Sequence, residues 1–203
     1  MSFSSKANVI LTSSFSTVAK ELWDKGLLPN KAKVAFIPTA GDYYKDKPWM
    51  EADRKALTDL GYHVVDVDLK DKNSDRMAAD FAAADILFVA GGNTTYLTAQ
   101  AHLSGFDAIV RDLLRQGKIY IGSSAGSILA GPTVEPFIAE DLPELPSDFV
   151  LADPTCLGLV DYIVLPHYPK HADENDKIAE KFGTKFHFIK ITDREYRVEN
   201  IVG

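Results

Sequence analysis

The chain has almost no cysteine, since Cys156 is the only one among its 203 residues. A single cysteine excludes an internal disulfide and any zinc site built from several cysteines, and we expect a small buried apolar side chain at this position. Long apolar runs are also missing. No stretch approaches the roughly 18 residues of a membrane span, and the polar start MSFSSKANV lacks the apolar core of a signal peptide. We therefore expect a cytoplasmic protein without a membrane partner.

Positive charge is scarce as well. The formal net charge is −7, with 22 Lys and Arg against 29 Asp and Glu, and the basic residues are scattered along the chain. Because nucleic-acid binding needs a clustered basic surface, we exclude a nucleic-acid partner. The apolar share of 46 % is ordinary for a globular protein. Without repeats, low-complexity tracts or an internal linker, we expect one domain over residues 1–203, as a monomer or a homodimer.

Short apolar runs alternate with helical patterns along the chain. The runs predict strands at 8–12, 33–38, 62–69, 85–90, 119–121, 162–166 and 186–191, and the patterns predict helices between them. Few of the runs alternate with polar residues, which is typical of strands covered on both faces. The order predicts a three-layer α/β fold, with helices on both faces of an open, mostly parallel sheet. We expect residues 196–202 to pair as a closing hairpin strand, and the proline-rich, acidic segment 133–155 to form a surface excursion.

The stretch KIYIGSSAGSILAG, residues 118–131, combines a strand, a tight turn and a helix of small residues. Its turn fits the pattern G-x-S-x-G, which exposes a serine hydroxyl on a strained strand-to-helix turn. Gly122 and Gly126 leave room for the chain around Ser124, and the N–H of Ala125 can face a developing oxyanion. The pattern predicts a nucleophile at Ser124. A turn that binds phosphate or only caps the helix is the alternative.

A second glycine-rich turn, GGNTT, follows the predicted strand 85–90. A double glycine lets the backbone approach another group closely. A free N–H of Gly92 would then point to the same site as that of Ala125, and two such donors would complete an oxyanion hole. A plain turn in which Asn93 or Thr94 caps the next helix explains this segment equally well.

Five histidines are present, and His167 is the best candidate for a general base. It lies at the C-terminal tip of a strand that follows the serine motif, where open α/β sheets place their chemistry. A triad also needs an acid that orients the imidazole. Asp193, after the next strand, is the first candidate, and Glu195, two residues further into the turn, is the second. A solvated turn acid is the alternative for both.

Two other features are weaker signals. Asp66 and Asp68 look like a paired acid site, but alternate residues of a peripheral strand more often face water. The loop TAGDYYKDKPW, residues 39–49, follows the second strand and is placed either to line a pocket or to pack on the surface.

Three motifs in this order carry a resemblance to a known family: GGNTTYL (91–97), YIGSSAGSILAGPT (120–133) and LPHY (165–168). Together they resemble the peptidase E group of serine peptidases, which are aspartyl dipeptidases related to cyanophycinase on a glutamine-amidotransferase-like, flavodoxin-like α/β fold. IPTAG after the second strand and ITDREY near the end also fit, so the resemblance covers nearly the whole chain.

The resemblance implies a role for each of these residues. Ser124 would be the nucleophile, His167 the general base and acid, and Gly92 with Ala125 the oxyanion donors. It implies no cofactor and no metal.

The chain departs from the family at three positions. The third triad member of the family is usually a glutamate, and the matching residue here is Asp193, one methylene shorter. Ser123 stands where aspartyl dipeptidases commonly have an aromatic residue, and the segment YPKHADENDK after His167 lacks the arginine associated with an N-terminal aspartate. The preference for Asp-X peptides is therefore open. Relatives usually run further than Gly203, so we expect a piece of the far edge of the sheet to be absent.

These features predict a serine peptidase that hydrolyses short peptides, such as dipeptides, through an acyl-enzyme on Ser124. Two alternatives stay open. The same triad would serve an esterase or amidase that acts on a non-peptide acyl group, and the same fold would serve a non-catalytic protein that binds a small ligand.

Overall fold

The computed structural model describes residues 8–70 and 72–201. Within these residues, six strands form a central sheet in the order β3-β2-β4-β5-β1-β8. Their bounds are Val9–Thr12 (β1), Lys33–Ile37 (β2), His63–Asp66 (β3), Ile86–Val89 (β4), Ile119–Ser123 (β5) and Tyr196–Glu199 (β8). Strands β1 to β5 pair in parallel, and β8 runs antiparallel to β1. The sheet is therefore mostly parallel, as predicted.

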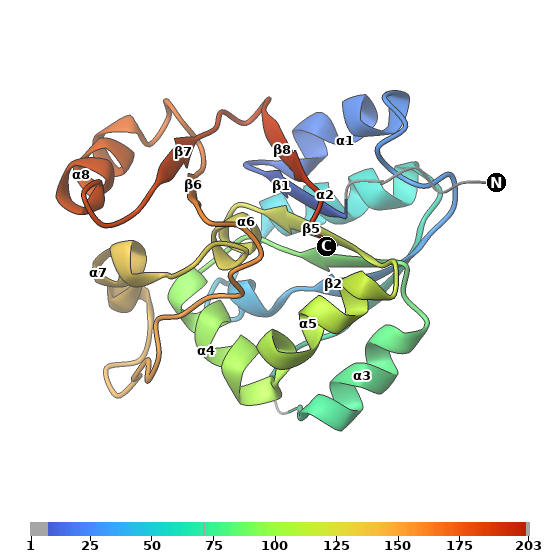
Figure 1. The fold of residues 1–203 in the computed structure, drawn as a ribbon, viewed down its shortest axis with the longest axis horizontal. Helices are drawn as coiled ribbons and strands as arrows, with labels where there is room; N and C mark the ends of the chain where they lie inside the picture. Colours follow the sequence, from blue (N-terminus) through green and yellow to red (C-terminus); the bar gives the residue numbers. More distant parts are fainter. Residues whose placement is uncertain (1–7, 71, 202–203) are drawn as a thin grey trace.

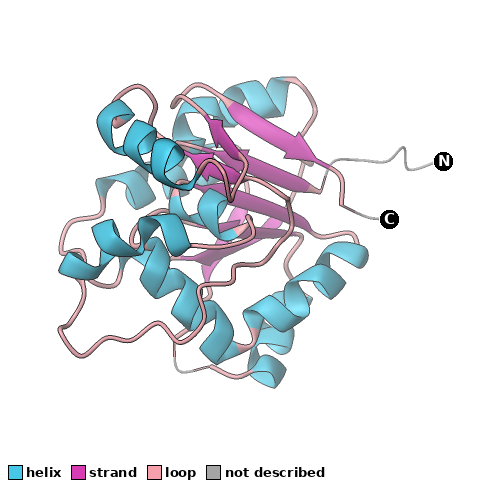
Figure 2. Cartoon of the chain, turned by 60° about the vertical axis from the view of Figure 1, so that its left-hand side comes forward, coloured by secondary structure: helices cyan, strands magenta, loops and turns pink. Residues whose placement is uncertain are grey.

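Helices cover both faces of this sheet (Figures 1 and 2). Helices α1 (Phe15–Asp24) and α2 (Pro48–Asp59) pack on one face. The other face is covered by α3 (Ser74–Ala82), α4 (Thr94–Ser104), α5 (Phe106–Arg115) and α6 (Ala125–Leu129). This arrangement confirms the predicted three-layer α/β fold.

Successive strand residues point into two separate hydrophobic cores. On β4, Ile86 and Phe88 belong to the core beneath α1 and α2, whereas Leu87 and Val89 belong to the opposite core. All four side chains are fully buried. Because both faces are covered, these strands carry apolar residues at every position, which is why the sequence shows few alternating patterns.

A second, two-stranded parallel sheet lies beside the central one. It consists of β6 (Ile163–Leu165) and β7 (Phe188–Lys190), which are connected through α8 (Ala172–Phe182). In Figure 1 this unit appears in orange and red next to α7 (Ile138–Asp141). The predicted excursion 133–155 contains α7 between the short 3₁₀ turns Glu135–Phe137 and Leu142–Glu144.

The predicted pairing of residues 196–202 was wrong. Instead of forming a hairpin with β7, the strand β8 pairs with β1, where Val198 lies opposite Ile10. Without β8, β1 would be an edge strand with unpaired N–H and C=O groups. The main-chain N–H of Asn8 also donates to Glu199 O, which extends the pairing. Residues 202 and 203 lie outside the described part of the chain.

The structure also tests what the composition predicted about Cys156 and about membrane spans. Cys156 is 6 % exposed, and burial raises the pKa of its thiol to about 12, so it is a small buried side chain as predicted. Among the described residues, no helix is both long and apolar enough to cross a membrane.

Candidate active site

Ser124 lies on a strained turn between β5 and α6. Its backbone has φ 51° and ψ −110°, a conformation that is rare for a residue other than glycine. Gly122 and Gly126, two residues before and after Ser124, have no room for a side chain. A Cβ on Gly122 would lie 2.6 Å from the backbone of Gly126, and a Cβ on Gly126 would lie 2.1 Å from the carbonyl oxygen of Val89. We call residues 122–126 the serine turn.

Hydrogen bonds fasten the serine turn to the end of β1. The N–H of Ser124 donates to Thr12 O over 3.0 Å. The hydroxyl of Ser127 accepts from Thr12 N at 2.9 Å and lies within donating distance of Thr12 O at 2.7 Å. Tyr120, fully buried, donates its hydroxyl to Gly126 O at 2.6 Å. The position of Ser124 is therefore set by two neighbouring strands of the large sheet.

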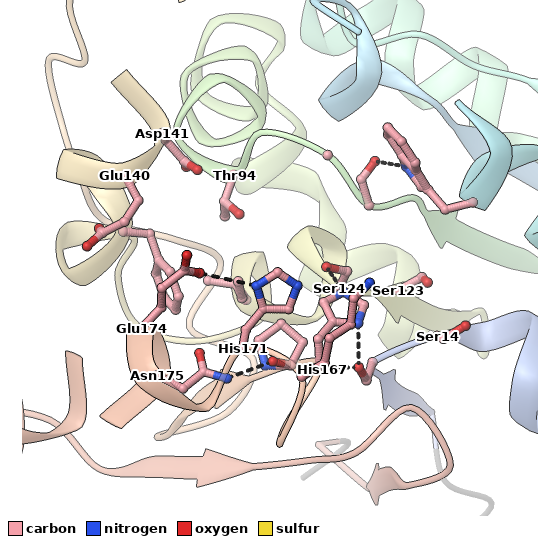
Figure 3. Close-up of a pocket in the computed structure, with 18 of the residues that line it drawn as sticks. Ser14, Thr94, Ser123, Ser124, Glu140, Asp141, His167, His171, Glu174 and Asn175 are labelled. Carbon is pink, nitrogen blue, oxygen red and sulfur yellow. Dashed lines mark hydrogen bonds and ion pairs between the residues drawn. The ribbon is translucent and has the colours of Figure 1, made fainter. Parts of the chain in front are cut away.

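His167 follows β6 and contacts Ser124. Its Nε2 lies 3.0 Å from Ser124 Oγ, within hydrogen-bonding distance. Its backbone has φ 59°, again in the left-handed region. The preceding carbonyl of Pro166 accepts a hydrogen bond of 2.8 Å from the buried amide of Asn175 on α8 (Figure 3). Helix α8 thus holds the segment that presents the imidazole to the serine.

Of the two candidate acids, Asp193 contacts the imidazole. Its Oδ1 lies 2.6 Å from His167 Nδ1, whereas the carboxylate of Glu195 accepts from Thr192 N at 2.8 Å within its own turn. Partial burial raises the pKa of Asp193, but hydrogen bonds from Ser13 and His167 and the attraction of nearby positive charge outweigh it. The pKa of Asp193 is therefore lowered, and the group is a carboxylate at neutral pH.

Ser13, which the sequence analysis did not single out, makes three contacts in the same place. Its hydroxyl donates to Asp193 Oδ1 at 2.6 Å, lies 3.1 Å from His167 Nδ1 and accepts the main-chain N–H of His167 at 2.7 Å. The available signal was its place in a polar turn at the carboxyl end of β1. That signal became informative only once β1 was known to lie beside β5.

The glycine-rich turn after β4 also lies against Ser124. A Cβ on Gly91 would come 3.1 Å from Ser124 Cβ. Gly92 has φ 145°, and a Cβ added to it would lie only 2.2 Å from Ala40 O. Asn93 caps α4 through the N–H of Tyr96 at 2.9 Å, so the capping interpretation also holds. In the described part of the chain, the N–H groups of Gly92 and Ala125 donate to no protein acceptor.

A cavity of about 470 Å³ opens in front of Ser124 and His167. The strand-end turns of the large sheet form one wall, and Figure 3 shows Glu140, Asp141, His171 and Glu174 on the other side. Tyr44 and Trp49 line the cavity too, as one of the two interpretations of the loop 39–49 predicted. The sequence did not predict that Glu140 and Asp141 of α7 line the cavity, because the irregular segment 133–155 carries no pattern that indicates how it packs against the strand ends.

Comparison with known proteins agrees with this geometry. The model of peptidase family S51 matches residues 4–193. The chain belongs to peptidase family S51. It is 34 % identical over 161 residues to an uncharacterized peptidase of Listeria innocua, covering 79 % of this chain and 76 % of the relative. It is 31 % identical over 186 residues to peptidase E of Salmonella arizonae, covering 83 % and 72 %.

The solved structures agree with the family. A crystal structure of a candidate peptidase E protein from Listeria monocytogenes matches with a TM-score of 0.83 at 28 % identity, over 95 % of this chain and 94 % of the other. A peptidase from an acI-B1 actinobacterium shares the fold, with a TM-score of 0.69 at 18 % identity. Membership in S51 makes this chain a peptidase, and thus a hydrolase.

The cavity of this S51 peptidase is rich in carboxylates. Asp53, Glu140, Asp141 and Glu174 line it, together with Lys170 and two histidines. Among the described residues that line it there is no arginine. The charge balance of the cavity is therefore acidic.

Two of these acids have raised pKa values, the buried Asp53 and the partly buried Asp141. Burial raises the pKa of Asp141 to about 6, and its neighbours Glu144 and Glu140 add to this, although hydrogen bonds from Thr95 oppose it. Burial also raises the pKa of Asp53, which accepts the N–H of Ser16 at 2.8 Å. Both acids hold a proton more readily than an exposed carboxyl does.

Asp66, the last residue of β3, and Asp68, two residues beyond it, do not belong to this site. Asp66 forms an exposed ion pair with Arg54, and Asp68 accepts the hydroxyl of Thr39 at 2.7 Å. Neither lines the cavity. Across the described residues, no three His, Cys, Asp or Glu side chains are grouped so that they could hold a metal ion.

Proposed function

We propose that this S51 peptidase hydrolyses short peptides, of dipeptide size, through an acyl-enzyme on Ser124. One observation carries the proposal. The hydroxyl of Ser124, the imidazole of His167 and the carboxylate of Asp193 form a continuous series, with separations of 3.0 Å and 2.6 Å. Nucleophile, base and orienting acid in this order are what acyl transfer by a serine requires.

Each group then has a defined step. His167 Nε2 takes the proton of Ser124 as its oxygen attacks the peptide carbonyl, and it returns that proton to the leaving amine. A water molecule repeats the sequence to release the acid. Asp193 holds the proton on His167 Nδ1 and stabilises the imidazolium, which its lowered pKa supports because the group stays ionised.

The proposed oxyanion donors are the N–H groups of Gly92 and Ala125. Both belong to turns next to Ser124, and neither donates to a protein acceptor in the described part of the chain. Two preorganised donors stabilise the negative oxygen that develops in the transition state, and one such donor is commonly worth about 100- to 1,000-fold in rate.

Cavity size and charge limit the substrate. A volume of about 470 Å³ lies in the usual range for small ligands, roughly 300 to 1,000 Å³, and suits a dipeptide better than a long chain. Among the described residues that line the cavity, four acids against the single cation Lys170 disfavour an acidic residue beside the scissile bond. We propose substrates with a neutral N-terminal residue, whose free ammonium group faces this acidic wall.

A dipeptide panel tests the proposal. Leu-Leu, Ala-Leu and Asp-Leu share one leaving residue, so differences among them report the N-terminal side chain. We expect the wild type to cut the neutral peptides faster than Asp-Leu, and Ser124→Ala to cut none. Ser14→Ala is the matched control, because Ser14 also lines the cavity, but within the described part of the chain its hydroxyl bonds only to Ser16 and Thr17.

Three outcomes would contradict parts of the proposal. Preferential cleavage of Asp-Leu would overturn the neutral preference. Cleavage of ester or amide probes without cleavage of any peptide would favour a non-peptide acyl substrate. If no probe is cut and a serine-directed phosphonate leaves Ser124 unlabelled, the nucleophile assignment is wrong and a ligand-binding role is favoured.

A further inference from the structure

Ser13 lies at the point where the two sheets meet. It directly follows β1 of the large sheet, and its contacts are His167 and Asp193, which follow the two strands of the small sheet. Its exposed fraction is 1 %, so water does not compete for its hydroxyl. The bonds that Thr12 makes with Ser124 and Ser127 hold the backbone beside it. The Ser13 hydroxyl therefore has a fixed position.

The protons available to this cluster determine which way each bond runs. A serine hydroxyl has one proton to donate. Ser13 accepts the main-chain N–H of His167 and donates its own proton to Asp193 Oδ1. It therefore has no proton left for His167 Nδ1, although the two atoms are 3.1 Å apart.

The alternative tautomer of His167 has an unfavourable contact. If Nδ1 carried no proton, it and Asp193 Oδ1 would be two acceptors only 2.6 Å apart. The single proton of Ser13 could be donated to one of them, and their lone pairs would repel across this short distance. With the proton on Nδ1, every close contact in the cluster has a donor and an acceptor. Nε2 is then free to accept the proton of Ser124.

We propose that Ser13 is a positioning residue that selects the Nδ1–H tautomer of His167, by committing its only proton to Asp193. Its role in catalysis rests on the proposed function of Ser124 and His167. The tautomer selection itself is a property of the resting protein. The effects of Ser13 and Asp193 depend on each other. While Asp193 accepts the Ser13 proton, the Ser13 hydroxyl cannot donate to His167 Nδ1.

The pairing predicts an unusual result when Asp193 is removed. In Asp193→Ala, the Ser13 proton has lost its acceptor, and Nδ1 at 3.1 Å is the nearest remaining one. Ser13 then donates to Nδ1 and stabilises the opposite tautomer, with the proton on Nε2. In that form Nε2 cannot act as a base. Removing Ser13 as well should release the ring from this wrong tautomer.

Nitrogen NMR of the histidine ring measures the tautomer without any substrate. We would label histidine with ¹⁵N, identify the His167 signals with His167→Gln, and record spectra at a pH where titration shows the ring to be neutral. We expect an Nδ1–H ring in the wild type, an Nε2–H ring in Asp193→Ala, and a mixture of both in Asp193→Ala/Ser13→Ala. Ser14→Ala should match the wild type.

Kinetics provides the second readout. Ser13→Ala should lower kcat about 10-fold with little change in KM, since one hydrogen bond in the resting cluster is lost and no substrate contact is. The kcat of the double variant should be at least as high as that of Asp193→Ala. If the two substitutions acted independently, the double variant would instead be slower, by the product of the two single losses. Ser13→Gly, which removes the same hydroxyl with a different backbone cost, guards against a variant that fails to fold, and thermal unfolding of each variant checks this.

The outcomes separate this inference from the proposed function. The inference would be overturned if Asp193→Ala and Asp193→Ala/Ser13→Ala showed the same tautomer of His167. It would also be overturned if the loss of kcat in the double variant equalled the product of the losses in the two single variants. If the tautomers change as expected while the wild type cleaves no substrate, tautomer selection by Ser13 is supported and the proposed peptide hydrolysis fails.

Discussion

The two sides of the candidate site are built differently. Ser124 and Gly92 lie on turns of the large sheet, where glycines without space for a Cβ and buried hydrogen bonds leave the backbone little freedom. His167 and Asp193 follow strands of three residues each in the small sheet, and their side chains are 30 % and 43 % exposed. The side that carries the proposed nucleophile, which we call the nucleophile side, is fixed by local packing, whereas the positions of the proposed base and acid depend on how one sheet packs against the other.

This difference explains why Ser13 matters. It is the buried hydroxyl that connects the β1 end of the large sheet to both residues of the small one. Mutations on the nucleophile side should therefore affect folding and activity together. Mutations of the small-sheet residues that form the contact between His167 and Asp193 should affect activity more than stability.

Apart from the complete loss of cleavage expected for Ser124→Ala, the largest expected effect is on the small-sheet side, at the acid. Asp193→Asn should lower kcat by roughly 1,000- to 10,000-fold, because an amide at this position can donate to Nδ1 and favours the wrong tautomer of His167. The matched control is Glu195→Gln, whose carboxylate faces Thr192 N and not the ring. We expect that control to stay within about 3-fold of the wild type, because no contact with the ring is lost. Equal losses in the two variants, measured with the dipeptide panel, would show that the acid is assigned wrongly.

On the nucleophile side we expect a loss of stability as well as activity. In Gly126→Ala the new Cβ would lie 2.1 Å from Val89 O, and the backbone must shift, at a cost of about 3 kcal/mol or more. Gly61→Ala is a control with φ 80° and no atom within 4 Å, which should cost only about 1 to 2 kcal/mol. Urea unfolding of both variants measures the difference. A Gly126→Ala protein as stable as Gly61→Ala would mean that the serine turn is not tightly packed.

A smaller effect is expected where α8 supports the base. Asn175→Ala leaves the buried Pro166 carbonyl without its 2.8 Å hydrogen bond, which should cost about 1 to 3 kcal/mol of stability. The His167 backbone beside it should also become less well placed, so we expect kcat to fall about 5- to 10-fold. Lys177→Ala, an exposed position on the same helix, is the control and should leave both kinetics and unfolding unchanged. A loss of stability with an unchanged kcat would show that α8 does not position the base.

The smallest expected effect depends on pH and concerns Asp141 on α7. Its pKa is about 6 in the folded protein, above the roughly 3.9 of an unfolded aspartate. The folded state therefore binds more protons between these values, and the wild type should lose stability as pH rises from about 4 to 6. Asp141→Asn removes this dependence, so relative to the wild type it should gain about 1 to 3 kcal/mol over that range. Unfolding curves at pH 4, 5, 6 and 7 measure this, and a constant difference between the two proteins would contradict the raised pKa.

Much of the fold followed from local patterns. Apolar runs and glycine or asparagine signals located β1, β2, β4, β5 and most helices to within a few residues. The partner of β8 did not follow, because a strand of four residues carries too little pattern to distinguish β7 from the edge of β1. Likewise, β6 is as apolar as the central strands and β7 has only three residues, so their separation into a second sheet was not visible.

The candidate site divides in the same way. The serine turn, the double-glycine turn and His167 were predicted because each follows the carboxyl end of a predicted strand, although the strand before His167 belongs to the small sheet and not to the large one. The choice between Asp193 and Glu195 needed the geometry, since the two differ only in which side of one turn they face. Ser13 is 154 residues from His167 in the chain, and no spacing rule connects them.

By itself, then, the sequence determined the elements, the parallel α/β architecture and the strained turn at Ser124, because backbone conformation and burial depend on neighbouring residues and on glycine. Only the tertiary structure decided which acid contacts His167, that Ser13 joins them, and that the acids of α7 line the cavity. These contacts join segments far apart in the chain. Their geometry depends on how two sheets pack together, and no local pattern of residues encodes it.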